Sequence, residues 1–348
     1  MAEVLEPCGV VINFNGRQLK NLDLIESNCG YLFVRSTTKV NKTLLNGTNV
    51  KFVGSATSGI DHIDKVYLDD HNIDFVDAPG SNANSVAEYV VFSMLKWARM
   101  RDIPLRNLTI GVVGYGNIGK VVARYSFNMG MQVLVNDPPL RAKGFEFPHY
   151  CEYAPLDEIC IRSDVFTNHV PLSLDGSFPT INLINRKKID LLRRGSLLVH
   201  ASRGGVIDEE PLLERILTHE LQAAIDVWQE EPLINKVLAS NVLISTPHIA
   251  GYSRDGKLRG TLKMANAVAD SCDLAPDLSL LYKELSSYKP TTVDEFKKET
   301  EVFMKLRENR MLEQDSENLK ATLYLGDDER SQTFDMLRKN YPQRRESL

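Results

Sequence analysis

Residues 111–119, Gly111-Val-Val-Gly114-Tyr-Gly116-Asn-Ile-Gly119, decide the fold of this chain. The apolar run 110–113 has the length of a buried strand, and the pattern G-x-G-x-x-G leads from it into helical periodicity. Gly114 allows a tight turn, Gly116 lets the backbone approach a pyrophosphate, and Gly119 lets a helix pack closely against its strand. The free N–H groups at the start of that helix attract a phosphate. We therefore predict a dinucleotide site whose turn consists of Gly114, Gly116, Asn117, Ile118 and Gly119.

A second apolar run, 133–135, ends just before Asp137, which lies 18 residues past Gly119. A carboxylate at this place can hydrogen-bond the ribose hydroxyls of an adenosine. It would also repel a 2′-phosphate, and Pro138 and Pro139 follow it where NADP would favour an arginine. The motif therefore predicts NAD as the cofactor. An ordinary glycine turn with a surface acid at a strand end is the alternative.

Strand-length apolar runs alternate with helical patterns on both sides of this motif, which is typical of parallel α/β sheets. After the motif they are residues 133–135, 165–167, 197–199, 224–225 and 242–244, and before it 32–34, 50–53 and 75–76. We expect two doubly wound α/β lobes and a small C-terminal α+β module rich in charged residues. The expected bounds are 1–95 for the first lobe, completed by about 250–285, then 96–250 for the NAD-binding lobe and 286–348 for the module.

Three polar side chains each follow one of the later strands: Arg203, Glu231 and His248. Because ligands bind at the carboxyl ends of parallel strands, these side chains can converge. A histidine can remove a hydroxyl proton near neutral pH, and a nearby glutamate would raise its pKa and orient its ring. An arginine binds a carboxylate through its planar, charged fork. Together they predict oxidation of a 2-hydroxy acid, whereas each one alone could be an ordinary ion pair, helix acid or loop histidine.

Four segments together resemble the D-isomer-specific 2-hydroxyacid dehydrogenase family: residues 114–119, 200–205, 226–232 and 247–252. The match covers roughly residues 30–270. This resemblance implies catalytic roles for Arg203, Glu231 and His248. It also implies an NAD site lined by Asp137, Val170, Ala201, Ser202, Arg203, Asp226 and Gly251.

Further segments resemble one branch of that family, whose members oxidise 4-phospho-D-erythronate at C2 for pyridoxal phosphate synthesis: residues 34–41, 54–64, 252–257 and 334–346. This resemblance implies substrate contacts at Ser36, Thr57 and Tyr252, and a homodimer formed through the C-terminal module. Arg35 and Lys39 lie in the same predicted loop as Ser36, where they could hold a phosphate or remain solvated.

Two other functions remain possible at this point. One is a different D-2-hydroxyacid dehydrogenase that acts on glycerate or phosphoglycerate. The other is a non-catalytic, NAD-binding corepressor. Family members usually begin with a further strand and helix, so we expect either that the first lobe is smaller and lacks an edge strand or that the start of this sequence is misassigned.

The composition excludes some partners. The chain has 348 residues, 41 basic and 46 acidic, and this small negative excess predicts neither nucleic acid nor membrane binding. It contains no uninterrupted apolar stretch long enough to span a membrane, and its acidic opening residues lead us to expect no secretory leader. The five cysteines lack metal-binding spacing, which indicates reduced thiols, no metal site and a cytoplasmic protein.

Overall fold

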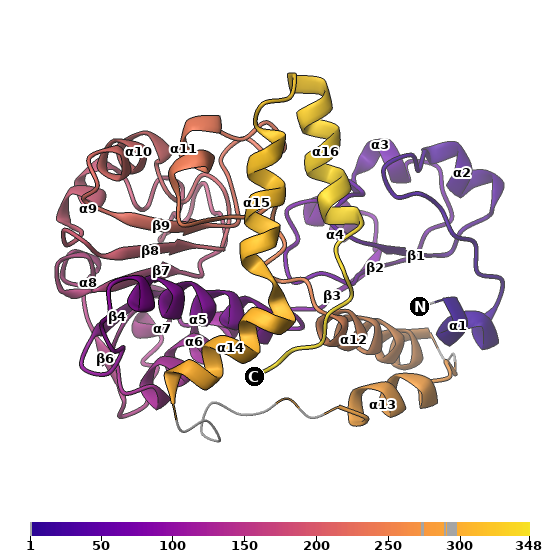
Figure 1. The fold of residues 1–348 in the computed structure, drawn as a ribbon. Helices are drawn as coiled ribbons and strands as arrows, with labels where there is room; N and C mark the ends of the chain where they lie inside the picture. Colours follow the sequence, from indigo (N-terminus) through magenta and orange to yellow (C-terminus); the bar gives the residue numbers. More distant parts are fainter. Residues whose placement is uncertain (1, 273–274, 289, 291–297) are drawn as a thin grey trace. The chain divides into compact units, whose positions relative to one another are not determined.

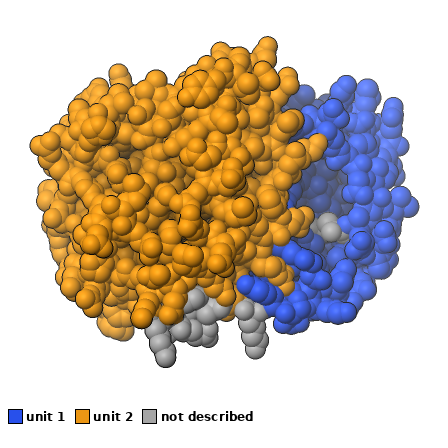
Figure 2. All heavy atoms as spheres, in the orientation of Figure 1, with its two compact units in different colours: residues 1–82, 253–289 blue, residues 83–252, 290–348 orange. Residues whose placement is uncertain are grey.

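The computed structural model describes residues 2–272, 275–288, 290 and 298–348. The chain divides into two compact units, which are coloured separately in Figure 2. The first combines Met1–Asn82 with Ser253–Lys289, and the second combines Ala83–Tyr252 with Pro290–Leu348. Each unit has a parallel sheet of its own, as expected for two α/β lobes.

The sheet of the first unit contains three parallel strands in chain order: β1 (Tyr31–Val34), β2 (Phe52–Ser55) and β3 (Asp74–Asp77). One face packs against α2 (Asn21–Glu26), α3 (Lys42–Leu45) and α4 (Lys65–Asp70). The other face packs against Val268 of α12 (Arg254–Cys272). The strand order shows no reversal, in contrast to the doubly wound sheet expected here. Both faces are nevertheless covered, because α12 joins this unit from much later in the chain.

The sheet of the second unit contains seven parallel strands in the order β10-β9-β8-β7-β4-β5-β6. The strands are β4 (Thr109–Val113), β5 (Gln132–Asn136), β6 (Cys151–Tyr153), β7 (Val165–Asn168), β8 (Leu197–His200), β9 (Gln222–Ile225) and β10 (Ile244–Ser245). The order reverses between β4 and β7, as in the doubly wound sheet that we expected. Such a reversal opens a crevice at the carboxyl ends of the strands.

Helices cover both faces of this sheet (Figure 1). One face packs against α5 (Ala83–Met100) and α6 (Asn117–Asn128). The opposite face packs against α8 (Leu156–Arg162), α9 (Arg186–Leu191), α10 (Glu209–Leu217) and α11 (Lys236–Asn241). Helix α5 is buried over most of its circumference, which agrees with its largely apolar sequence. It begins the second unit, although we expected the first lobe to extend to residue 95.

The C-terminal residues 298–348 form α14 (Glu299–Arg310), α15 (Leu312–Thr322) and α16 (Asp327–Lys339). Helix α14 packs on α5, where the rings of Phe303 and Phe92 stack with centroids 5.3 Å apart. Within this described stretch there is no strand, in contrast to the expected α+β module. These helices also belong to the same compact unit as the seven-stranded sheet, instead of forming a separate module.

Among the residues that the structure describes, no helix is both long and apolar enough to cross a membrane.

Candidate active site

The glycine turn after β4 has the geometry that a dinucleotide requires. Gly114 has φ +88°, a conformation that side chains other than glycine rarely adopt. A Cβ on Gly119 would lie 2.0 Å from the carbonyl oxygen of Gly114, so only glycine lets α6 approach the strand this closely. A Cβ on Gly116, by contrast, would meet no atom within 4 Å. Open space therefore adjoins the N-terminus of α6, where its free N–H groups can bind a pyrophosphate.

Asp137 is fixed beside this turn, directly after β5. Its Oδ2 accepts the N–H of Tyr115 at 2.8 Å, and its Oδ1 accepts the N–H of Leu140 at 2.9 Å. The carboxylate thus caps α7 (Pro138–Ala142) and holds the glycine turn against the next strand. This position suits a ribose contact, and the residues around the turn fit NAD.

The chemical centre of the second unit is a hydrogen-bonded pair, His248 and Glu231. The Nδ1 atom of His248 lies 2.9 Å from Oε2 and 3.1 Å from Oε1 of Glu231. Burial raises the pKa of Glu231, but the adjacent His248 and Arg338 outweigh it and hold that pKa below its usual value. Because an ionised carboxylate only accepts hydrogen bonds, Nδ1 of His248 carries a proton and Nε2 is directed elsewhere. The pair can therefore act as a base through Nε2.

Two other histidines of this unit are poor candidates for that role. Burial lowers the pKa of both His169 and His200 to about 3. They stay neutral at any ordinary pH, and both hydrogen-bond neighbouring side chains of the sheet.

The segment that carries His248 is held by the buried side chain of Asp226. Its Oδ1 accepts the N–H of Ile249 and the hydroxyl of Thr246, each at 2.7 Å, and its Oδ2 accepts the N–H of Ala250 at 2.9 Å. The N–H of His248 donates to the Asp226 carbonyl at 2.8 Å. His248 has φ +57°, which is unusual for a side chain of this size and needs such support. The resemblance implied an NAD contact for Asp226, and the structure adds this supporting role.

Arg203 follows β8 on a loop that packs directly on the loop after β9. A Cβ on Gly204 would lie 1.9 Å from the carbonyl oxygen of Trp228, so this approach requires glycine. The Arg203 side chain is half-buried, and its Nη1 donates to the Ser202 carbonyl at 2.7 Å. The loop therefore brings a permanent positive charge to the strand-end edge on which Glu231 also lies.

The remaining predicted cofactor residues lie at the same edge of the sheet. Val170 follows β7, where its Cγ1 would lie 3.0 Å from a Cβ on Gly114. Ala201 and Ser202 are buried directly after β8, and the Ser202 hydroxyl donates to Asn168. Gly251 is half-buried, three residues past His248. Their contacts with NAD stay predictions.

The first unit carries four of the five predicted substrate residues, at the carboxyl ends of its strands. Arg35, Ser36 and Lys39 follow β1 and are exposed, and Thr57 follows β2 and donates to the Gly59 carbonyl at 3.0 Å. Sequence reasoning left out Lys257 on α12, which has its pKa lowered by burial and by Arg35. This effect of Arg35 on the pKa means that Lys257 is a second cation near the loop of Arg35, Ser36 and Lys39.

Tyr252 lies in the second unit, and its ring meets that of Tyr341 edge-on with centroids 5.8 Å apart. Sequence reasoning also missed Arg338 of α16, whose charge acts on Glu231. Arg338 and Lys257 lie in the segments 334–346 and 252–257 that resemble relatives. No local pattern shows, however, that Arg338 would act on Glu231 or that Lys257 would lie near Arg35.

The described residues contain no group of three or more His, Cys, Asp or Glu side chains that could hold a metal ion. Cys8, Cys29, Cys151 and Cys160 carry free thiols, and the side chain of Cys272 lies outside the described ones.

Known proteins are similar to this chain in sequence and in fold. Residues 86–250 match the family model of the D-isomer specific 2-hydroxyacid dehydrogenase, NAD binding domain. The chain is 39% identical to the erythronate-4-phosphate dehydrogenase of Salinibacter ruber, over 97% of this chain and 87% of that protein. It is 38% identical to that of a Marinomonas species, over 95% of this chain and 86% of that protein.

Among solved structures, D-lactate dehydrogenase from Aquifex aeolicus, complexed with NAD and lactic acid, superposes with a TM-score of 0.59. It is 26% identical and covers 72% of this chain and 84% of its own. The relatives are similar over almost the whole chain, and the glycine turn, Arg203, Glu231 and His248 lie in the segment that the family model matches. The chain therefore belongs to the D-isomer specific 2-hydroxyacid dehydrogenase family and, within it, to the erythronate-4-phosphate dehydrogenases.

Proposed function

We propose that this chain oxidises 4-phospho-D-erythronate at C2 with NAD, and that the product is 3-hydroxy-2-oxo-4-phosphobutanoate, a step in pyridoxal 5′-phosphate synthesis. The hydrogen-bonded His248–Glu231 pair is the single observation that carries the chemistry, because it supplies a base at the edge of a dinucleotide-binding sheet. The relatives' similarity at 39% and 38% identity over nearly the full chain supports the substrate.

Bound NAD would supply the acceptor for the hydride that leaves C2. The Nε2 atom of His248 takes the proton of the C2 hydroxyl, and the Glu231 carboxylate stabilises the resulting imidazolium. The Arg203 guanidinium binds the substrate carboxylate and polarises the C2 oxygen as it becomes a carbonyl. One hydride and one proton thus leave each molecule of hydroxy acid, and a 2-oxo acid remains.

Other residues would bind the two ligands. Ser36, Thr57 and Tyr252 are the proposed substrate contacts, and Arg35 and Lys39 would neutralise its phosphate. The glycine turn and Asp137 would hold NAD, together with Val170, Ala201, Ser202, Asp226 and Gly251. A homodimer formed through the C-terminal helices and a cytoplasmic location are further parts of this proposal.

A substrate panel tests the proposal. Purified protein with NAD is offered 4-phospho-D-erythronate, 3-phosphoglycerate, D-glycerate and D-lactate, and the NADH formed is followed by its fluorescence. We expect turnover of 4-phospho-D-erythronate alone. Turnover restricted to D-glycerate or 3-phosphoglycerate would contradict the proposed substrate and indicate a different dehydrogenase of the family. NAD binding without any turnover would favour the corepressor-like alternative.

A further inference from the structure

The last residue of helix α14, Arg310, is buried completely and contacts the segment that carries His248. Its Nη2 donates to the Ala250 carbonyl at 2.9 Å, two residues past the histidine. Its Nη1 donates to the Ser85 hydroxyl at 2.6 Å, and this hydroxyl donates to the same carbonyl at 2.8 Å. A side chain from the C-terminal helices thus contacts the backbone of the catalytic segment.

Ala250 is consequently held at both of its backbone polar groups. Its N–H donates to Asp226, which directly follows β9, and its carbonyl accepts from Arg310 and Ser85. The positive φ of His248 makes the support important, because an unsupported backbone would relax from that conformation. A backbone that relaxed from this conformation would move the imidazole relative to Glu231.

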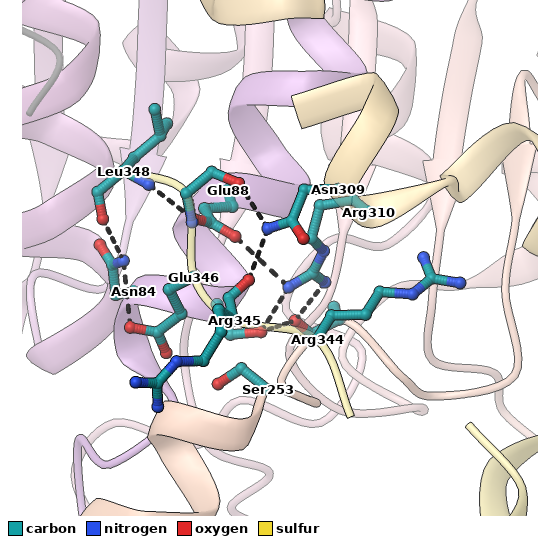
Figure 3. Close-up of polar contacts among 12 residues, drawn as sticks. Asn84, Glu88, Ser253, Asn309, Arg310, Arg344, Arg345, Glu346 and Leu348 are labelled. Carbon is teal, nitrogen blue, oxygen red and sulfur yellow. Dashed lines mark hydrogen bonds and ion pairs between the residues drawn. The ribbon is translucent and has the colours of Figure 1, made fainter. Parts of the chain in front are cut away.

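The Arg310 guanidinium faces the carboxyl group of Glu88 on helix α5 (Figure 3). Its Oε2 lies 3.6 Å from Nη1 of Arg310, and both side chains are buried. The other oxygen of Glu88 accepts the N–H of Ser347 and, at 2.8 Å, that of Leu348. The segment after α16 therefore fixes Glu88, Glu88 faces Arg310, and Arg310 fixes the backbone beside His248.

Residues 345–348 also form hydrogen bonds with two asparagine side chains. The amide of Asn84 donates to the Leu348 carbonyl at 2.7 Å and to Glu346 at 3.2 Å. The amide of Asn309 donates to the Arg345 carbonyl and to the Ser347 hydroxyl, both at 2.5 Å. Asn309 immediately precedes Arg310, so the end of α14 and residues 345–348 form one connected network.

We propose that Arg310 is a positioning residue for the reaction: by fixing the Ala250 carbonyl it sets the orientation in which His248 meets Glu231 and presents Nε2. This inference rests on the proposed role of His248 as the base. It extends the catalytic machinery from the strand-end loops to the C-terminal helices, which are more than 50 residues away along the chain.

The test compares Arg310→Met with Arg307→Met. Arg307 lies one turn earlier on α14, where it is exposed and pairs with Glu313 at 2.7 Å. Because Arg310→Met alone would leave Glu88 buried without its cation, the decisive variant is the double substitution Arg310→Met/Glu88→Gln, which removes both charges. Arg310→Lys keeps the charge and a single donor, and it serves as the conservative variant.

Two quantities are measured on folded protein. The first is kcat and KM with 4-phospho-D-erythronate and NAD across pH. The second is the pKa of the His248 imidazole, measured by NMR. The signal of this imidazole is identified because it is missing from the spectrum of His248→Asn. We expect kcat of the double variant to fall by about tenfold or more, because small misplacements of a reacting group are costly. The KM for NAD should stay unchanged, and the pKa of His248 should differ from that of the unsubstituted protein. For Arg310→Lys, kcat and the pKa of His248 should both lie closer to the values of the unsubstituted protein.

A folded double variant with the kcat and His248 pKa of Arg307→Met would overturn the inference. An unaltered His248 pKa with a uniform loss of active protein would mean a structural role only and would overturn it too. If the unsubstituted protein does not turn over the substrate, the proposed function fails, and the NMR comparison still decides whether Arg310 positions His248.

Discussion

Two glycines three residues apart in the turn after β4 should respond to the same substitution in opposite ways. A Cβ on Gly116 would occupy space that holds no protein atom within 4 Å, and the backbone there has φ −78°, which alanine tolerates. Gly116→Ala should therefore lower stability by less than about 1 kcal/mol, the usual effect at a helix N-cap. Its methyl group would instead keep a pyrophosphate away from the N–H groups of α6.

The expected loss of affinity follows from those hydrogen bonds. One hydrogen bond to a charged group contributes about 1.5–3 kcal/mol. Loss of one such bond corresponds to an NAD affinity lower by about 10- to 100-fold. Gly326 provides a matched control, because it is also a helix N-cap with no atom within 4 Å of a Cβ, at the start of α16.

Gly119→Ala should act on the fold instead. The new Cβ would lie 2.0 Å from the Gly114 carbonyl oxygen, which is backbone and cannot rotate away. Helix α6 would have to shift from β4, and overpacking of this kind costs about 1–3 kcal/mol. We expect the upper end of that range.

Urea unfolding and calorimetric titration with NAD separate the two effects. The reasoning is refuted if Gly116→Ala binds NAD as tightly as Gly326→Ala does. It is equally refuted if Gly119→Ala unfolds at the urea concentration of the unsubstituted protein.

Three further predictions concern the side chains around the catalytic segment. His248→Asn should lower kcat by about 10²–10⁴-fold, the usual contribution of a general base, and leave calorimetric NAD affinity unchanged. Asp226→Asn would turn an N–H group toward the Ala250 N–H and should reduce stability by about 1–3 kcal/mol, measured by urea unfolding. Burial raises the pKa of Glu88 from 4.5 to about 7, so the folded state retains a proton that the unfolded state releases. Stability should therefore fall as pH rises from 4.5 to 7, and Glu88→Gln should flatten this dependence of the urea midpoint.

The central sheet could be predicted because its information is local. Strands buried on both faces are continuous apolar runs, and the glycine motif fixes where strand, turn and helix follow one another. Strand β6, Cys151–Tyr153, was missed because it has only three residues, and one of them, Glu152, is exposed. The predicted α+β character of the C-terminal segment differs from the three helices that residues 298–348 form, because dense charge and sparse apolar residues gave no clear period there.

The residues of the candidate site could be predicted where their position follows from the order of the strands. Glu231 and His248 follow neighbouring strands, so topology alone brings them together, and their hydrogen bond confirms that they meet. Arg310 lies in a charged stretch whose pattern suggests a solvated helix, and its polar partners lie 60 to 225 residues away. Nothing nearby in the sequence indicates that it would be buried.

The contact of residues 347 and 348 with Glu88 has a consequence for synthesis of the chain. About 260 residues separate these partners, and at 5–20 residues per second a ribosome needs about 13–52 s to bridge them. The sheet and its glycine turn can form during that interval. Glu88 and the segment that carries His248 gain their remaining contacts only when α14 and the residues after α16 have been synthesised. We therefore expect a chain that ends before residue 310 to bind the nucleotide without catalysing the reaction. Enzymatic activity would then appear only after residue 310 and the residues after α16 have been synthesised.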